Sequence, residues 1–273
     1  MEIFLLYCRA ATLTTAIAKA LALLDAFPDN GRAMGAAELA SALRLSKSTV
    51  HRDLAELAAV GLLDYHDGRY RLGWRIVELA ESITGWTRPM REAALPYLLD
   101  FYERTHATIT LAVLLPEAVL CVERLFGHQR LPISTRIGDR LPLHCTALGK
   151  VLLAFDPSWP RRLSPRGAFT AVTARTITSP RALARQLREV SDRGYALVDG
   201  EMTLGVACIA APVFARPGGI ATAAIAAAIP SANLDPVPLG DGVRKTAHAV
   251  SLCLQGLSTR EPRAAGKPWH QGR

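Results

Sequence analysis

The segment LRLSKSTVHRDLAEL, residues 43–57, limits the fold of this chain more than any other stretch. Ser46 is a good N-cap for a helix that extends to about Val60. The buried apolar stripe of this helix is predicted to consist of Val50, Leu54 and Leu57. Lys47 in the first turn opposes the helix dipole, at roughly 0.3–1 kcal/mol. A nearby phosphate would explain that cost, because the backbone N–H groups and Lys47 would then bind one anion together.

The segments around this helix predict a winged helix-turn-helix. A helix over 14–27 and a short helix over 36–43 precede it. GLLDY and RYRLG follow it as two strands around His66-Asp67-Gly68, and Asp-Gly between apolar strands is a strong hairpin signal. Periodicity predicts which side chains of these flanking elements point inward: Ile17, Leu21, Leu24, Phe27, Leu39, Ala40, Leu43, Tyr70 and Leu72.

The outer face of the third helix is a candidate DNA-contact surface. Ser48, His51 and Arg52 lie away from the buried stripe, and the small residues around them would let this face enter a major groove. An ordinary solvated helix face is the alternative, and the wing arginines are explained equally well as solvated residues. The predicted DNA-binding residues are Arg44, Ser46, Lys47, Ser48, Thr49, His51, Arg52, Arg69 and Arg71.

Net charge does not by itself identify the partner. The chain has 273 residues, a net charge of +8 and a pI of about 9.6, which fits a nucleic-acid binder, an anionic ligand or a soluble surface. Residues 1–85 carry 9 basic and 10 acidic side chains, whereas residues 86–258 carry 19 and 13. A DNA footprint in the first part therefore depends on where its charges lie, not on their sum.

The pattern after the wing predicts a mixed α/β domain. A helical stretch over 74–86 leads out of the wing, and Arg88-Pro89 predicts a break before the next helix. Further helices are expected after His144, from Ser179-Pro180 to Gly194, and over 241–257. The predicted strands are ATITLAVLL (107–115), AVLCVERL (118–125), YALVD, VACIAAPVF and GIATAAIAAAI.

Length and pattern together predict an α+β chain of two domains, because 273 residues exceed the roughly 100–200 expected of one domain. The predicted parts are an N-terminal arm (1–13), a winged helix-turn-helix domain (14–73), a helical linker (74–87), a mixed α/β domain (88–258), to which the family resemblance described below assigns effector binding, and a disordered basic tail (259–273).

The cysteines and the apolar segments bear on location. Cys8, Cys121, Cys145, Cys208 and Cys253 show no CxxC pair and no metal-type spacing, so we expect reduced thiols in a cytoplasmic protein. The start MEIFLLYCRAA lacks a basic region, and its apolar run is too short for a signal peptide. No run approaches the ~18 apolar residues of a membrane span.

Catalysis is the main chemical alternative. His144-Cys145, with Asp199 and Cys208 elsewhere, suggests a thiol enzyme or a metal site. Adjacent residues rarely present nucleophile and base to one another, however, and cysteine is often buried. We therefore predict no enzyme, no metal and no cofactor. Lys150 lacks the glycine spacing of a phosphate loop and is predicted to be a surface or hinge residue.

Four segments in order resemble the IclR family of bacterial transcriptional regulators, over about Thr14 to Leu257. ELASALRLSKSTVHRDLAELAAVGLL resembles the family's helix-turn-helix, and GRYRLG resembles the end of its wing. IGDRLPLHCTALGKVLLA (137–154) and RTITSPRALARQLREVSDRGYALVDGEMTLGVACIAAPVF (175–214) resemble its effector domain. The resemblance implies a GAF-like sheet that binds a small organic effector, often an organic or aromatic acid. It also implies a dimer or dimer of dimers on near-palindromic operator DNA.

The resemblance also implies where the effector would bind. The family's last strand often reads ISVSGP, whereas this chain has IAAAIP at 225–230, so two hydroxyls are missing and an apolar or aromatic acid is favoured. Lys19 also replaces the family's usual arginine. Backbone N–H groups around 145–149, or an arginine such as Arg136, are expected to hold the acid group. The predicted effector-binding residues are Arg136, Cys145, Ala147, Leu148, Asp199, Glu201, Cys208, Ala226 and Ala228.

One rival to a DNA-binding regulator stays open. It is a ligand sensor whose N-terminal domain has lost the ability to bind DNA, and the near-neutral charge of residues 1–85 supports it. The Ser46–Arg52 surface argues against it. The sequence does not distinguish a repressor from an activator.

Overall fold

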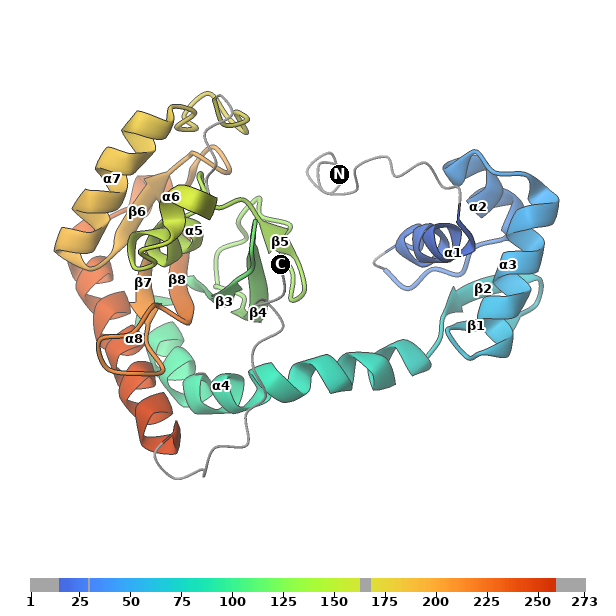
Figure 1. Cartoon of the computed structure of the whole chain (residues 1–273), viewed down its shortest axis with the longest axis horizontal. Helices are drawn as coiled ribbons and strands as arrows, with labels where there is room; N and C mark the ends of the chain where they lie inside the picture. Colours follow the sequence, from blue (N-terminus) through green and yellow to red (C-terminus); the bar gives the residue numbers. More distant parts are fainter. Residues whose placement is uncertain (1–14, 29, 163–167, 259–273) are drawn as a thin grey trace. The chain divides into compact units, whose positions relative to one another are not determined.

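The computed structural model describes residues 15–28, 30–162 and 168–258. The chain divides into two compact units, Met1–Gly85 and Trp86–Arg273 (Figure 1). The predicted N-terminal arm and basic tail lie outside the described residues. The prediction of an α+β chain with an N-terminal helix-turn-helix is confirmed.

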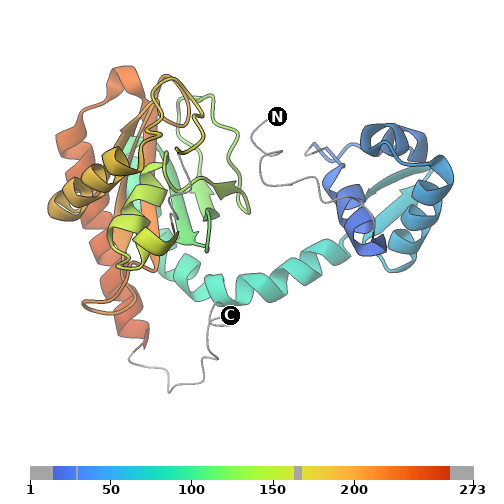
Figure 2. The same ribbon diagram turned by 45° about the horizontal axis from the view of Figure 1, so that its top comes forward.

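In the described part of the first unit, three helices and a hairpin precede the start of the long helix α4 (Arg75–Thr105) (Figure 2, blue). Leu39, Val50, Leu54 and Tyr70 lie in its apolar core. The hairpin turns at Asp67 and Gly68, whose φ angles of 50° and 75° are the left-handed values that a two-residue turn of this type requires. The elements are α1 (Ala16–Asp25), α2 (Ala36–Leu43), α3 (Lys47–Ala59), β1 (Leu63–His66) and β2 (Arg69–Leu72).

The predicted inward faces of α1 and of the wing are partly wrong. Ile17 and Leu21 are exposed, whereas Leu23 is fully buried and Phe27 packs beside it. The helix AIAKALALLD is apolar on nearly every side, so more than one stripe satisfies helical periodicity, and packing against α2 and α3 selects among them. Leu72, at the end of its short edge strand, is 45% exposed.

The predicted break at Arg88-Pro89 is wrong, because helix α4 (Arg75–Thr105) continues through Pro89 and Pro96. Each proline removes one helical hydrogen bond. Both prolines are exposed, so water can bind the carbonyl groups that lose their partners. Burial of Leu98 and Phe101 in the second unit stabilises the later part of the helix.

The second unit is built on a six-stranded antiparallel sheet in the order β5-β4-β3-β8-β7-β6 (Figure 1). The pairing of residues 107–115 with 118–125 is confirmed. The two-residue edge strand β5 has no periodicity to reveal it. The strands are β3 (Thr108–Leu114), β4 (Val119–Leu125), β5 (Arg140–Leu141), β6 (Ala196–Asp199), β7 (Val206–Val213) and β8 (Ala223–Pro230).

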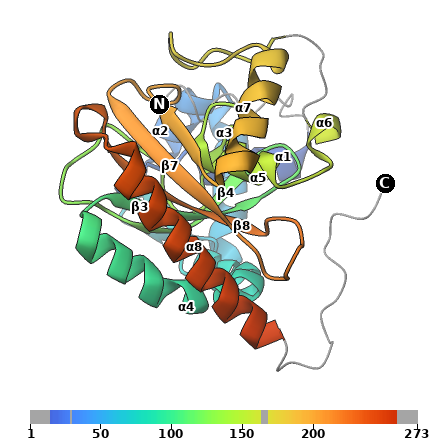
Figure 3. The same ribbon diagram turned by 90° about the vertical axis from the view of Figure 1, so that its left-hand side faces the viewer.

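Helices cover both faces of this sheet. The later part of α4 and helix α8 (Pro236–Ser258) pack on one face, where α8 crosses β7 and β8 (Figure 3). Helices α5 (Ala147–Ala154) and α7 (Pro180–Arg193) pack on the other. Two short pieces, α6 (Trp159–Arg162) and η2 (Ser231–Asn233), complete the elements.

Strand β8 shows how the sequence divides these two faces. Ile225 and Ala227 contribute to the core beneath α4 and α8, whereas Ala224 and Ala226 contribute to the core beneath α5 and α7. Successive side chains of a strand point to opposite faces. Because both faces are covered, the strand is apolar along its whole length. None of the described helices is long and apolar enough to cross a membrane.

Candidate functional site

The first candidate surface is the N-terminal half of α3. The Ser46 hydroxyl accepts a hydrogen bond from the Thr49 backbone N–H at 3.2 Å and lies 2.7 Å from the Thr49 hydroxyl. Ser46 therefore caps the helix, and the Thr49 hydroxyl contacts the capping hydroxyl. Lys47, Ser48 and His51 are exposed beside them, so the first turn presents polar groups to solvent.

The arginines around this surface are exposed, and several of them already have hydrogen-bond or ion-pair partners. The Arg52 guanidinium lies 3.5 Å from the Asp53 carboxylate. On the wing, Arg69 donates to the Ala33 carbonyl at 3.1 Å, and Arg71 pairs with Asp64 at 3.2 Å. The exposed Arg44 ends α2 in the left-handed conformation, with φ at 54°. Wing arginines that bind phosphate must therefore share their donors with these partners.

The second candidate site is a pocket on the α5 side of the sheet, which we call the sheet pocket. The cavity that the centres of water molecules can reach has a volume of about 80 Å³. By the same measure, one water needs only ~10–15 Å³. A small organic molecule fits such a site. The lining residues are Thr110, Arg124, Ile133, Thr135, Leu141, Cys145, Thr146, Ala147, Leu148, Val198, Met202, Thr203, Val206, Cys208, Ala226 and Ala228.

Six of the nine predicted effector-binding residues lie in this wall, and three do not. The residues in the wall are Cys145, Ala147, Leu148, Cys208, Ala226 and Ala228. Arg136 is exposed and lies outside the wall. Asp199 instead pairs with Arg175 and accepts a hydrogen bond from the Ser231 hydroxyl. Glu201 lies behind the wall, in a buried ion pair.

The sheet gives the pocket an apolar half and a polar half. Ala228 of β8 is the register partner of Cys208 of β7, and both line the apolar half. Thr110 of β3 lies between Ala226 and Arg124 in the register of three neighbouring strands. Register partners of an antiparallel pair point to the same face of the sheet. The row Arg124–Thr110–Ala226 therefore runs from a cation through a hydroxyl to a methyl group.

The start of α5 forms the wall opposite the sheet. Thr146 caps this helix, because its hydroxyl accepts from the Gly149 N–H at 3.1 Å and donates to the Pro142 carbonyl at 2.7 Å. A Cβ atom at Gly149 would lie 2.3 Å from the Leu143 carbonyl oxygen, so only glycine allows this close approach. The glycine thereby fixes the helix start that carries Ala147 and Leu148 into the pocket.

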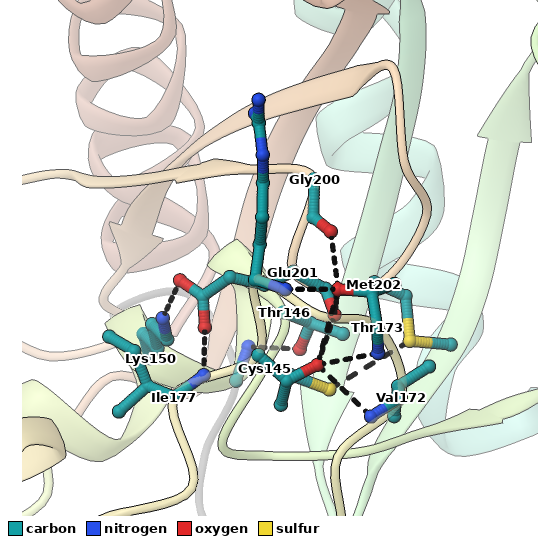
Figure 4. Close-up of polar contacts among 12 residues, drawn as sticks. Cys145, Thr146, Lys150, Val172, Thr173, Ile177, Gly200, Glu201 and Met202 are labelled. Carbon is teal, nitrogen blue, oxygen red and sulfur yellow. Dashed lines mark hydrogen bonds and ion pairs between the residues drawn. The ribbon is translucent and has the colours of Figure 1, made fainter.

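A buried ion pair supports the loop that follows β6. The Lys150 ammonium donates to a Glu201 carboxylate oxygen, and the Ile177 N–H donates to the other oxygen at 3.2 Å (Figure 4). Lys150 is fully buried, so the prediction of a surface or hinge lysine is wrong. Burial lowers its pKa, whereas the neighbouring Glu201 carboxylate acts in the opposite direction. The lysine was misassigned because its partner lies 51 residues away in the chain.

Two threonines fasten the same loop from the other side. The Thr173 hydroxyl donates to the Gly200 carbonyl at 2.7 Å, and the Thr176 hydroxyl donates to the Glu201 carbonyl at 2.7 Å. Figure 4 shows these contacts meeting around residues 200–202. The loop carries Met202 into the pocket wall, where its sulfur lies 3.8 Å from the Cys145 sulfur. The pocket wall is thus held in place by polar contacts outside it.

The chemistry of the thiols does not suit catalysis. Burial raises the pKa of Cys145 to about 12 and that of Cys208 to about 12, so both stay protonated at neutral pH. The His144 ring stacks on Phe169, and its Nε2 donates to the Thr170 carbonyl at 3.0 Å. The Cys145 thiol instead contacts the Met202 sulfur at 3.8 Å, and no hydrogen bond joins it to His144 among the described residues. No metal-type cluster of His, Cys, Asp and Glu occurs among residues 15–28, 30–162 and 168–258.

Comparison with known families identifies the chain. Residues 16–67 match the IclR helix-turn-helix domain, and residues 86–252 match the bacterial transcriptional regulator IclR C-terminal domain. The chain belongs to the IclR family of transcriptional regulators. The similar proteins are named as transcriptional regulators and not as enzymes.

Two relatives show how far this IclR-family likeness extends. The transcriptional regulator XynR of Escherichia coli is 33% identical over 201 residues, or 72% of this chain and 79% of that protein. The glycerol operon regulatory protein of Streptomyces griseus is 33% identical over 243 residues, or 86% of this chain and 94% of that protein.

Solved IclR-family structures share the fold. An IclR homologue from Microbacterium hydrocarbonoxydans, crystallised with 4-hydroxybenzoate, is 30% identical with a TM-score of 0.76. The match covers 89% of this chain and 100% of the Microbacterium hydrocarbonoxydans chain. The IclR protein of Thermotoga maritima is 25% identical with a TM-score of 0.74, over 90% of this chain and 99% of its own.

Sequence reasoning missed Arg124, whose guanidinium lines the sheet pocket of this IclR-family chain. Arg124 is only 9% exposed, and its Nε atom has no hydrogen-bond partner among the described residues. Burial lowers its pKa, and its guanidinium carbon lies 5.2 Å from the centre of the Phe126 ring. A signal was present in AVLCVERL, because an arginine inside a largely apolar predicted strand requires an explanation.

Proposed function

We propose that this DNA-binding transcriptional regulator of the IclR type binds a small organic acid in the sheet pocket, and that the acid changes its affinity for operator DNA. The observation that carries the proposal is the apolar half of the pocket, where Ala226, Ala228, Val198 and Leu148 offer methyl groups to a ligand. An aromatic or other apolar body gains free energy when such surface leaves water. The homologue crystallised with 4-hydroxybenzoate supports an aromatic acid.

The proposed DNA contacts come from the first unit. Ser46 caps the helix, Lys47 and Ser48 are exposed at its first turn, and Arg52 is exposed one turn later. We propose that the helix end binds a phosphate group and that Arg52 reads a base edge in the major groove. The wing residues Arg69 and Arg71, with Arg44, would add phosphate contacts.

The regulator is proposed to act as a dimer or a dimer of dimers. One recognition helix reaches only a few base pairs, and two-fold pairing doubles the contacts across two half-sites. Light scattering at micromolar concentration checks this, with twice or four times the 29.4 kDa chain mass expected. For each chain of this oligomer we propose a DNA-binding domain that begins at residue 14, a linker that begins at residue 74, and an effector-binding domain over 88–258. A protein that acts on operator DNA would also work in the cytoplasm, as the thiols predict.

Two measurements test the function. Gel-shift assays with DNA from upstream of the protein's own gene should show sequence-specific binding, and thermal-shift assays with a panel of organic acids should find a stabilising ligand. A ligand that binds only the folded state raises its stability by mass action. The same acid should then alter the gel shift. Ligand binding with no binding to any upstream DNA would instead favour a ligand sensor whose N-terminal domain has lost the ability to bind DNA.

A further inference from the structure

Arg124 presents a buried cation to the sheet pocket. Its side chain projects from β4, it is 9% exposed, and it lies in the pocket wall. Arginine stays protonated at neutral pH. A buried charge is strongly unfavourable unless a counter-charge or hydrogen bonds compensate it. Arg124 is therefore the candidate anion-binding group of the sheet pocket.

The nearby carboxylates are already engaged. Glu123, the preceding residue, pairs with Arg91 at 2.8 Å. Glu201 pairs with Lys150, and Asp199 pairs with Arg175. Asp139 acts on the Arg124 charge without pairing with it in the described part of the chain, and its carboxylate accepts a hydrogen bond from the Arg136 backbone N–H at 2.7 Å. The described residues give Arg124 no ion pair, and its Nε atom donates no hydrogen bond. Its guanidinium carbon lies over the Phe126 ring, 5.2 Å from the ring centre, a cation–π contact. The unpartnered Nε–H is available to a planar acceptor such as a carboxylate.

The surroundings of Arg124 define how a ligand would be oriented. Thr110, its partner on β3, places a hydroxyl next to the guanidinium, and Ala226 lies one strand further on. Thr135 adds a second hydroxyl to the wall. An acid group thus has donors at the β3–β4 side of the pocket, whereas the β8–β7 side offers only apolar contact and the Cys208 thiol.

We infer that Arg124 is the acid-binding residue of the sheet pocket, so that the ligand's carboxylate binds the guanidinium and its apolar body lies against Ala226 and Ala228. This inference rests on the proposed function and makes it specific. It assigns to Arg124 the role that sequence analysis gave to Arg136 or to the backbone N–H groups at 145–149. It also names the ligand class as carboxylates with an apolar or aromatic body, which should bind more tightly than uncharged amides of the same shape.

Calorimetry on the full chain tests the inference with matched ligands. The probes are benzoate, 4-hydroxybenzoate and phenylacetate, each beside its uncharged amide. The wild type is expected to prefer the acid of a pair. Arg124→Met should weaken acid binding by about 10- to 100-fold, since a hydrogen bond to a charged group contributes roughly 1.5–3 kcal/mol. Amide binding should change by less than about threefold, because the guanidinium binds charged acceptors most strongly.

Three further variants make the result specific to Arg124. Arg124→Lys keeps the charge but loses the planar donor pair, so its acid affinity should fall between wild type and Arg124→Met. Arg188→Gln, on the exposed face of α7, removes one positive charge outside the pocket and should bind every probe as the wild type does. Arg136→Gln tests the alternative arginine and should also keep the wild-type preference.

The possible failures are distinguishable. If Arg124→Met keeps the wild-type preference for acids, or if only Arg136→Gln loses it, Arg124 is not the acid-binding residue, although the proposed function stands. If the wild type binds neither acids nor amides of the panel, the proposed function fails and this inference fails with it. Amide binding retained by Arg124→Met shows that the pocket is folded, so a selective loss of acid binding supports the inference.

Discussion

The two units handle charge in opposite ways. On α3, Lys47, His51 and Arg52 stand in solvent on a surface built from consecutive residues. In the second unit, Lys150 is fully buried and Arg124 is nearly so. Exposed charges are screened by water and salt, so changing one alters partner binding with little effect on folding. Buried charges affect folding and ligand binding together. The four predictions below test this contrast, from the largest expected effect to the smallest.

The buried ion pair should give the largest effect. Lys150→Met alone, or Glu201→Gln alone, is expected to lower the free energy of unfolding by about 3–5 kcal/mol, because each leaves an uncompensated group in the interior. The double variant should recover most of that loss. Urea unfolding of all four proteins measures the coupling. Additive losses in the double variant would show that the pair is not coupled, and the contrast between the units would then weaken.

The α3 surface should show the opposite behaviour. Arg52→Ala is expected to weaken operator binding by roughly 1–3 kcal/mol and to relax preference at one base position. Lys47→Ala should weaken binding to all sequences alike and lower the slope of log K against log salt by about 0.9. Gel shifts over a salt series measure both. Since both side chains are exposed, melting should change little. Unchanged affinity in both folded variants would remove α3 as the recognition helix.

The apolar half of the sheet pocket should respond to added hydroxyls. Ala226→Ser combined with Ala228→Ser is expected to shift preference from benzoate toward small polar acids such as glyoxylate by roughly tenfold, at about 0.5–1.5 kcal/mol for each net hydrogen bond. Competition calorimetry with both acids measures the shift. A wild type that already prefers the two-carbon acid would show that these methyl groups do not set the specificity.

The smallest effect is a pH dependence from His144. Burial lowers its pKa below the ordinary value of 6.5, so the unfolded state binds more protons as the pH falls through 6.5. Stability present above pH 6.5 is therefore lost as the pH falls toward the lowered pKa. His144→Gln keeps a donor for the Thr170 carbonyl and should flatten this dependence. Melting temperatures between about pH 5 and 8 measure it, and equal slopes in both proteins would contradict it.

The sequence predicted the two units unequally, for a physical reason. Residues 43–57 form one local motif whose cap, stripe and outer face follow from helical spacing, and the structure reproduces the stripe of Val50, Leu54 and Leu57. The sheet pocket brings together residues from positions 110 to 228, so strand order decides which of them meet. Periodicity shows that Arg124 and Lys150 occur in regular elements, but it does not show their partners.

The resemblance to the family supplied what periodicity does not. It pointed to Cys145, Ala147, Leu148, Cys208, Ala226 and Ala228, which the structure places in one wall. It did not point to Arg124, because the acid group was assigned to more familiar donors. The continuous α4 was missed because the rule against helical conformation before proline is a local one, and exposure of Pro89 with packing of Phe101 outweighs it.

The alanines of strand β8 affect how the ligand preference of such a regulator would evolve by mutation. The side chains at 226 and 228 are single methyl groups whose directions are fixed by the pleat of the sheet. An alanine codon becomes a serine, threonine or valine codon by a single base change. Each of these mutations would change the size or the polarity of the sheet pocket wall, while the backbone of the sheet and the residues of α3 stay unchanged. If the sheet pocket binds an effector as proposed, one point mutation at 226 or 228 would change which small molecule the regulator responds to, and these two codons would be targets for directed evolution of biosensors.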